Sequence, residues 1–133
     1  MNKLFAKTLC VLYRVFFIDS NKGIEQLPEV SLEHAGQIVL KVHPKGHYMQ
    51  LKSYRKDGQS EFDIDMHDHN EDDKDYTHNG IHIHEYKLTY IKKFKAYKYK
   101  RQKGRDLTDE EYKCYIEDLN IENLTKIHVG YID

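Results

Sequence analysis

The segment from 60 to 67 constrains the fold more than any other part of the chain, because its polar and apolar side chains alternate strictly. The apolar positions are Phe62, Ile64 and Met66, and the polar positions are Glu61, Asp63, Asp65 and His67. Such alternation is typical of a strand that buries one face and turns the other away from the core. The chain is therefore expected to build its core against one side of a β-sheet.

A second segment, from 81 to 88, alternates in the same way. Ile81 and Ile83 point inward in this prediction, and His82 and His84 point outward. Further strands are predicted at 11–18, 37–43, 47–54 and 127–132. The dipeptide Asp57-Gly58 predicts a hairpin turn, because both residue types tolerate the positive φ that tight hairpin turns need.

One helix is predicted near the C-terminal end, over about 108–119. Thr108 provides an N-cap, and three acidic residues follow it in the first helical turn. The expected fold class is α+β, with one antiparallel sheet, one helix and a single domain over 1–133.

Length and cysteine content limit the class of protein. A chain of 133 residues is long enough for one hydrophobic core. The two cysteines, Cys10 and Cys114, provide no disulfide framework and no zinc-finger spacing, so a reducing, cytoplasmic setting is expected. No run of 18 uncharged apolar residues is present, so the sequence predicts no membrane helix.

Charge is balanced in total but not along the chain. Nine acidic residues lie between 57 and 75, and nine Lys or Arg residues with no acid lie between 86 and 105. The basic segment also contains five tyrosine or phenylalanine residues, so it is suited to bind phosphates by charge and bases by stacking. The residues predicted to bind RNA are Lys92, Lys93, Lys95, Lys98 and Tyr97. The alternative is a solvated sheet edge whose lysines only maintain solubility.

Histidines are concentrated between 67 and 84, where five of the nine occur. They are His67, His69, His78, His82 and His84. If the two alternating strands belong to one sheet, the outward residues share a face, and three interpretations follow. The residues can be a general acid–base site, a metal site, or a hydrogen-bonded surface without chemistry.

The acid–base interpretation needs no metal. His82 or His84 would pair with His67, Asp65 would orient one of the rings, and a lysine of the basic segment would stabilise the phosphorane. In the metal interpretation, zinc or another divalent ion is held by His67, His69, His82 and His84, with Asp63 or Asp65 as an oxygen donor.

A family resemblance covers 54–86. The motifs Tyr54-Arg55-Lys56-Asp57-Gly58, Phe62-Asp63-Ile64-Asp65, His67-Asp68-His69-Asn70 and His82-Ile83-His84-Glu85-Tyr86 carry it. Together they resemble domains that end bacterial polymorphic toxins and some phage-associated proteins, which are mostly predicted to be nucleases. The resemblance implies that Asp63, Asp65, His67, His82 and His84 form the site.

The sequence therefore predicts a domain that cleaves RNA phosphodiester bonds by metal-independent histidine acid–base catalysis, with no cofactor and with RNA as its partner. A second hypothesis is a phage- or mobile-element-encoded protein without catalysis, an inhibitor or immunity partner that binds another protein through its acidic segment and tyrosines. The third is a zinc or other divalent-metal-binding domain with the ligands named above.

Overall fold

The computed structural model describes residues 15–19, 27–43, 47–65, 80–121 and 124. Its elements run in chain order as β1 (Val15–Asp19), β2 (Ile38–His43), β3 (His47–Tyr54), β4 (Ser60–Asp65), β5 (His82–Ile91), β6 (Ala96–Arg101), β7 (Arg105–Asp106), α2 (Asp109–Tyr112) and the π-helical turn η2 (Lys113–Glu117).

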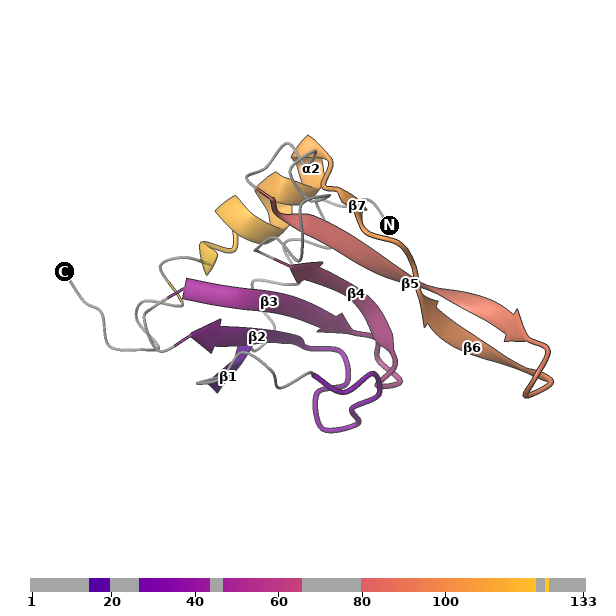
Figure 1. Cartoon of the computed structure of the whole chain (residues 1–133). Helices are drawn as coiled ribbons and strands as arrows, with labels where there is room; N and C mark the ends of the chain where they lie inside the picture. Colours follow the sequence, from indigo (N-terminus) through magenta and orange to yellow (C-terminus); the bar gives the residue numbers. More distant parts are fainter. Residues whose placement is uncertain (1–14, 20–26, 44–46, 66–79, 122–123, 125–133) are drawn as a thin grey trace.

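The strands form one seven-stranded sheet in the order β1-β2-β3-β4-β5-β6 (Figure 1). The short strand β7 pairs with the start of β5, on the edge of β5 that faces away from β4. Strand β1 runs parallel to β2, and every other pairing is antiparallel. The structure is thus a mostly antiparallel sheet with one short helical segment near the C-terminal end. This confirms the α+β class in general terms.

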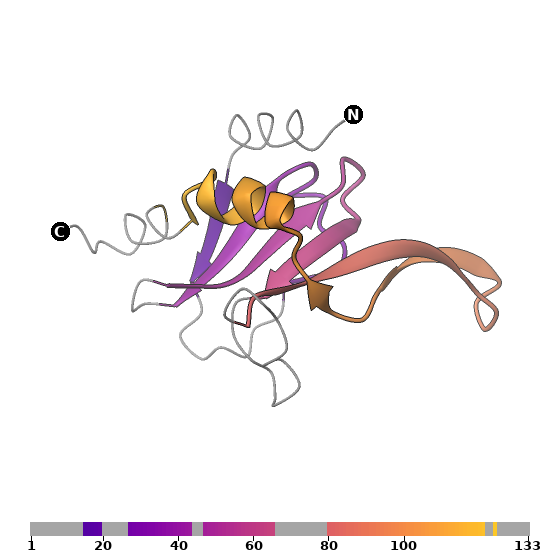
Figure 2. The same ribbon diagram turned by 90° about the horizontal axis from the view of Figure 1, so that it is seen from above.

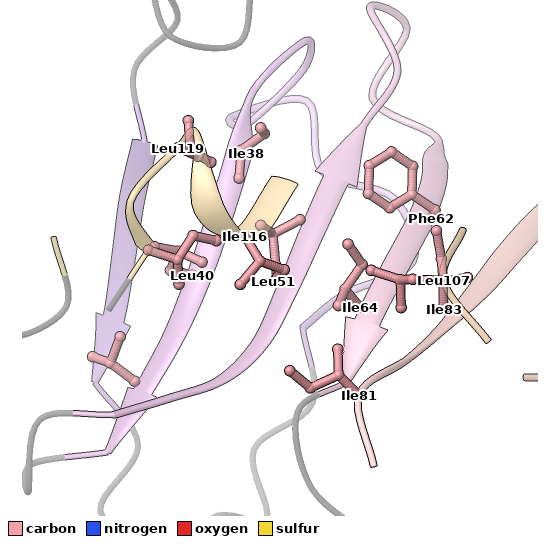
Figure 3. Packing of buried hydrophobic residues seen from close by; sticks show 12 residues of the cluster. Ile38, Leu40, Leu51, Phe62, Ile64, Ile81, Ile83, Leu107, Ile116 and Leu119 are labelled. Atoms are coloured by element: carbon pink, nitrogen blue, oxygen red, sulfur yellow. The ribbon is translucent and has the colours of Figure 1, made fainter. Parts of the chain in front are cut away.

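The helical segment crosses one face of the sheet (Figure 2). The hydrophobic core fills the space between them, and ten of its residues are labelled in Figure 3. Phe62, Ile64, Ile81 and Ile83 belong to this core, as the alternation predicts. Together with Leu51 on β3 they contact the helical segment's apolar residues Ile116 and Leu119 within one cluster.

Thr108 caps the start of the helix, as predicted from its type, and it also forms a capping box with Glu111. Its hydroxyl accepts a hydrogen bond from the Glu111 amide, and the Glu111 carboxylate accepts one from the Thr108 amide. The α-helical part is shorter than the predicted 108–119, because a π-helical turn follows from Lys113, with Asp118 N donating to Lys113 O. None of the described helices is long and apolar enough to cross a membrane.

The hairpin between β3 and β4 forms at the predicted Asp57-Gly58. Gly58 N donates to Arg55 O, and Arg55 N donates to Gln59 O. Only Gly58 has positive φ in this turn, at 86°, so the turn is not the primed type that needs two such residues. The predicted strands at 37–43 and 47–54 are also present. The predicted strand at 127–132 lies outside the described residues. So do positions 11–14 of the predicted strand at 11–18 and positions 66–67 of the predicted strand at 60–67.

Candidate metal centre

The sheet face opposite the core holds the candidate site. Strand alternation brings Asp63 and Asp65 of β4 to this face together with His82 and His84 of β5. The register places Asp63 directly across from His84, and Asp65 directly across from His82. The structure therefore places four of the five residues expected to form the site on one face of the sheet, and three of them, Asp65, His82 and His84, form one group. The fifth, His67, lies outside the described residues, as does the alternative ligand His69.

Asp65, His82 and His84 meet at their polar atoms. One oxygen of Asp65, Oδ2, lies 3.6 Å from His82 Nε2 and 3.5 Å from His84 Nε2. One ligand atom from each of the three side chains lies within 4.8 Å of the others. The Asp65 and His82 side chains are buried, and the His84 side chain is 12% exposed.

Both histidine rings are oriented by backbone carbonyls. His82 Nδ1 lies 2.9 Å from Gly80 O, and His84 Nδ1 lies 2.9 Å from Gln102 O. A carbonyl oxygen can only accept a hydrogen bond, so Nδ1 carries the proton in each ring. The other ring nitrogen, Nε2, is the atom that faces Asp65 in both histidines. Metal-binding histidines in proteins are usually held in this way.

Two of the three separations in this group, those from Asp65 Oδ2 to the two Nε2 atoms, are compatible with a small metal ion, and all three atoms lie within 4.8 Å of one another. Zinc binds imidazole nitrogen and carboxylate oxygen at about 2.0–2.2 Å with tetrahedral angles, so two such ligand atoms lie about 3.3–3.5 Å apart. The observed separations of 3.5 and 3.6 Å are close to this value. They are also longer than the 2.7–3.2 Å typical of an N–H···O hydrogen bond.

The protonation state of His84 suits a metal ligand. Burial lowers the pKa of His84 below its usual value, and the positive charge of nearby Arg101 lowers it further. The hydrogen bond to Gln102 and the charge of Asp65 act in the opposite direction without reversing the shift. His84 is therefore neutral at pH 7, as a ligand must be.

Asp65 is positioned by two further hydrogen bonds. Gln50 Nε2 donates to Asp65 Oδ1 at 2.7 Å, and Arg101 Nη2 donates to Asp65 Oδ2 at 3.1 Å. Carboxylate ligands of metal ions are commonly held by such partners. Gln50 comes from β3, directly across from Asp65, and Arg101 is the last residue of β6.

Asp63 belongs to a neighbouring polar cluster rather than to the histidines. Lys52 Nζ donates to Asp63 Oδ1 at 2.7 Å, and Tyr86 Oη and Arg101 Nε donate to Asp63 Oδ2 at 2.8 and 3.1 Å. Burial and then the charge of Asp63 raise the pKa of Tyr86 above its ordinary value. Burial alone would lower the pKa of Arg101. The negative charges of Asp63 and Asp65 outweigh this effect, so the pKa of Arg101 is raised above its ordinary value. Arg101 thus links the two carboxylates.

The residues predicted to bind RNA lie apart from this cluster. Lys92, Lys93 and Lys95 are in the turn between β5 and β6, and Tyr97 and Lys98 are on β6. All five are exposed. Lys98 Nζ lies 3.6 Å from Glu29 Oε2, so one of the predicted RNA contacts is engaged in a surface ion pair.

Four residues of the site were not singled out from the sequence: Gln50, Lys52, Tyr86 and Arg101. For the first three, the signal was present, because alternation along the predicted strands puts them on the same face as the acids and histidines. Arg101 could not be found this way, since its place depends on the register between β5 and β6, which pairs it with Tyr86.

No family model, curated protein or solved structure matches this chain.

Proposed function

We propose that the chain is a metal-dependent hydrolase of RNA phosphodiester bonds, in which Asp65, His82 and His84 hold a divalent transition-metal ion such as zinc. One observation carries the proposal. Two imidazoles anchored through Nδ1 turn Nε2 toward the same oxygen of Asp65, at 3.5 and 3.6 Å. Two histidines and one carboxylate, with a fourth position for water, are a common ligand set of catalytic zinc sites.

The charges around the site support an anionic substrate. Lys52 and Arg101 form ion pairs with Asp63 and Asp65, so the net charge of these four groups is zero. A bound divalent ion would leave the cluster positive and attract a phosphodiester. The guanidinium of Arg101, whose side chain is 40% exposed, is suited to contact a phosphate oxygen beside the ion.

The proposed reaction is a hydrolysis. A divalent ion held by Asp65, His82 and His84 would make a water bound to it easier to deprotonate, and so would supply a nucleophile for attack on the phosphorus. The bond between phosphorus and the leaving nucleoside oxygen breaks, and that oxygen takes up a proton from solvent. The products are a phosphomonoester and an alcohol, and no oxidant or second substrate is needed.

A metal-free reaction with His82 and His84 as acid and base has less support from the geometry. His82 exposes only 1% of its side chain, and its Nε2 faces Asp65. A general acid or base must come within hydrogen-bond distance of the proton that it transfers. Arg101 and His84 are the more exposed members of the cluster, so a substrate would approach it beside them.

The proposal is tested by calorimetric titration of chelator-treated protein with Zn²⁺. We expect one ion per chain, and loss of binding in His84→Ala and in Asp65→Ala. Replacing the supporting residue in Gln50→Leu should weaken binding about 10- to 100-fold. His34→Ala is the matched control, because His34 is a partly buried histidine on the 27–37 segment and not part of the cluster. Circular dichroism confirms that each variant is folded.

Activity is then measured on a labelled RNA. Cleavage that is lost with chelator, restored by Zn²⁺ or Mn²⁺ and lost in His84→Ala supports the proposal. Cleavage that continues in chelator would overturn the metal mechanism and favour histidine acid–base catalysis. Zinc binding that is equal in the wild type and in both ligand variants would overturn the assigned site.

A further inference from the structure

The β5–β6 hairpin extends from the sheet as a two-stranded ribbon beyond the strands that cover the core (Figures 1 and 2). Four of the six large apolar side chains that are exposed among the described residues lie on it. They are Leu88, Tyr90, Phe94 and Tyr97, with exposed fractions of 57%, 49%, 66% and 70%. Exposed aromatic residues in such a group commonly mark a binding surface.

Leu88, Tyr90 and Tyr97 form a row on one face of the ribbon, and Phe94 is in the turn at its tip. The register pairs Tyr90 with Tyr97 and Leu88 with Tyr99, and the next pair on the same face is Tyr86 with Arg101. Successive pairs on one face are about 6.7 Å apart along the strands. The row therefore runs from the tip of the hairpin to Arg101, which contacts Asp65 in the candidate metal centre.

The rings in this row are arranged for stacking. The Tyr90 and Tyr97 ring centroids are 5.3 Å apart with a 59° angle between their planes, so each ring leaves part of its surface open. Farther along, the Arg55 guanidinium lies 4.7 Å from the Tyr99 ring centroid. Exposed tyrosines and an arginine on a ring are the groups on which unpaired bases stack.

Charge complementarity identifies the kind of partner. Residues 87–100 include six lysines and no acid, and three of the lysines surround Phe94 in the turn. Such a ribbon attracts a polyanion and repels a second copy of itself. A polyanion with flat aromatic groups is a nucleic acid, and only an unpaired strand can offer its bases for stacking on side chains.

We propose that the β5–β6 hairpin binds single-stranded RNA, with bases stacked on Tyr90, Tyr97 and Phe94 and with a phosphate directed to Arg101. The inference rests on the proposed hydrolase in naming its substrate as an unpaired strand. Binding by the hairpin does not itself require the metal ion, so the two proposals can fail separately.

The test is fluorescence anisotropy of a labelled 12-nucleotide RNA with full-length protein in chelator, where the proposed cleavage is blocked. A base stacked on an aromatic side chain contributes about 1–3 kcal/mol, so Tyr97→Ala should weaken binding roughly 5- to 140-fold. Tyr97→Phe should keep most of the affinity, because it retains the ring. Leu32→Ala is the matched control, since Leu32 is an exposed apolar residue outside the hairpin.

The dependence of RNA affinity on salt concentration measures how much the lysine charges contribute to binding. Lys92→Gln and Lys93→Gln should each reduce the slope of log affinity against log salt, by up to about one. Lys113→Gln, an exposed lysine on the helical segment, should leave the slope unchanged.

Three outcomes would overturn the inference: no binding, an equal loss in Leu32→Ala and Tyr97→Ala, or equal affinity for an RNA duplex of the same length. Poly-glutamate that competes as well as RNA would also overturn it and would point to an acidic protein partner. Binding in chelator without any cleavage when metal is added would leave this inference standing and contradict the proposed hydrolase.

Discussion

Lys52 Nζ lies 2.7 Å from Asp63 Oδ1, and the two side chains are 2% and 3% exposed. The pair joins β3 to β4 on the sheet face opposite the core, where strand register places the two residues directly across from each other. Tyr86 adds hydrogen bonds to both members. A buried charge pair of this kind is strongly destabilising when one partner is removed.

Lys52→Met should therefore lower the free energy of unfolding by about 3 kcal/mol, measured by urea denaturation. The value is at the lower end of the 3–5 kcal/mol range, because Tyr86 and Arg101 still contact Asp63. Lys98→Met is the control, since its ion pair with Glu29 is exposed and should contribute less than about 1 kcal/mol. Equal losses in the two variants would contradict the assignment of Lys52 as a buried partner.

The lowered pKa of His84 predicts a dependence of stability on pH. In the unfolded chain His84 titrates near 6.5, and in the folded chain burial shifts its titration to lower pH. As the pH falls from 6.5 through the folded-state pKa, the unfolded state takes up the proton first. The contribution of His84 to stability is therefore present above pH 6.5 and is lost below it.

The measurement is the urea midpoint of chelator-treated protein at pH 7.5 and pH 5.5, in the wild type and in His84→Gln. Other groups titrate in this range, so the comparison is between the two proteins. We expect the midpoint to fall less in the variant, which cannot be protonated at this position. A larger fall in the variant would mean that His84 is not held in its neutral form.

Glu111 is a buried carboxylate, like Asp63 and Asp65, and it organises the start of the helix. Its two oxygens accept hydrogen bonds of 2.8 Å from Arg105 Nη1 and Nη2, while Oε1 also closes the capping box of α2. The bond to Glu111 is the main reason that the pKa of Arg105 is raised. Glu111→Gln should lower the free energy of unfolding by about 1.5–3 kcal/mol, as for a lost hydrogen bond to a charged group. Glu110→Gln, in the same helical turn but exposed, should cost less than about 1 kcal/mol.

Gly58 has little room for a side chain. Its φ is 86°, and a Cβ atom placed there would lie 3.0 Å from the carbonyl oxygen of Ser31. Gly36 provides the control, because its φ of 73° is similar but the nearest atom would be 3.8 Å away. Gly36→Ala should cost about 1–2 kcal/mol for the backbone conformation alone, and Gly58→Ala should cost more. Equal losses of unfolding free energy in Gly36→Ala and Gly58→Ala, from thermal or urea denaturation, would show that Gly58 is not in close contact with Ser31.

The strands and the polar face could be predicted from sequence because they depend on local periodicity. Alternation at 60–65 and 81–84 sets which side chains face the core, and it predicts that Asp65, His82 and His84 share the opposite face. Alternation does not indicate how deeply a side chain is buried. The sequence left open an acid–base site, a metal site or a hydrogen-bonded surface, and none of these predicts that Asp65 and His82 are buried.

The contact of Arg101 with Asp63 and Asp65 could not be predicted because it is set by long-range pairing. It requires β6 to fold back on β5 so that Arg101 lies opposite Tyr86. Similarly, the basic segment at 86–105 was expected to bind phosphates and bases as one surface. The register between β5 and β6 places its side chains on two opposite faces. Tyr90 and Tyr97 are on one face of the ribbon, whereas Lys87, Lys98 and Lys100 are on the other.

An anomalous difference map at the zinc absorption edge, from crystals of the protein grown with Zn²⁺, tests whether the three residues bind a metal ion. We expect one strong peak about 2.0–2.2 Å from Asp65 Oδ2, His82 Nε2 and His84 Nε2. A peak elsewhere, or a fully occupied zinc that does not touch both histidines, would contradict this expectation.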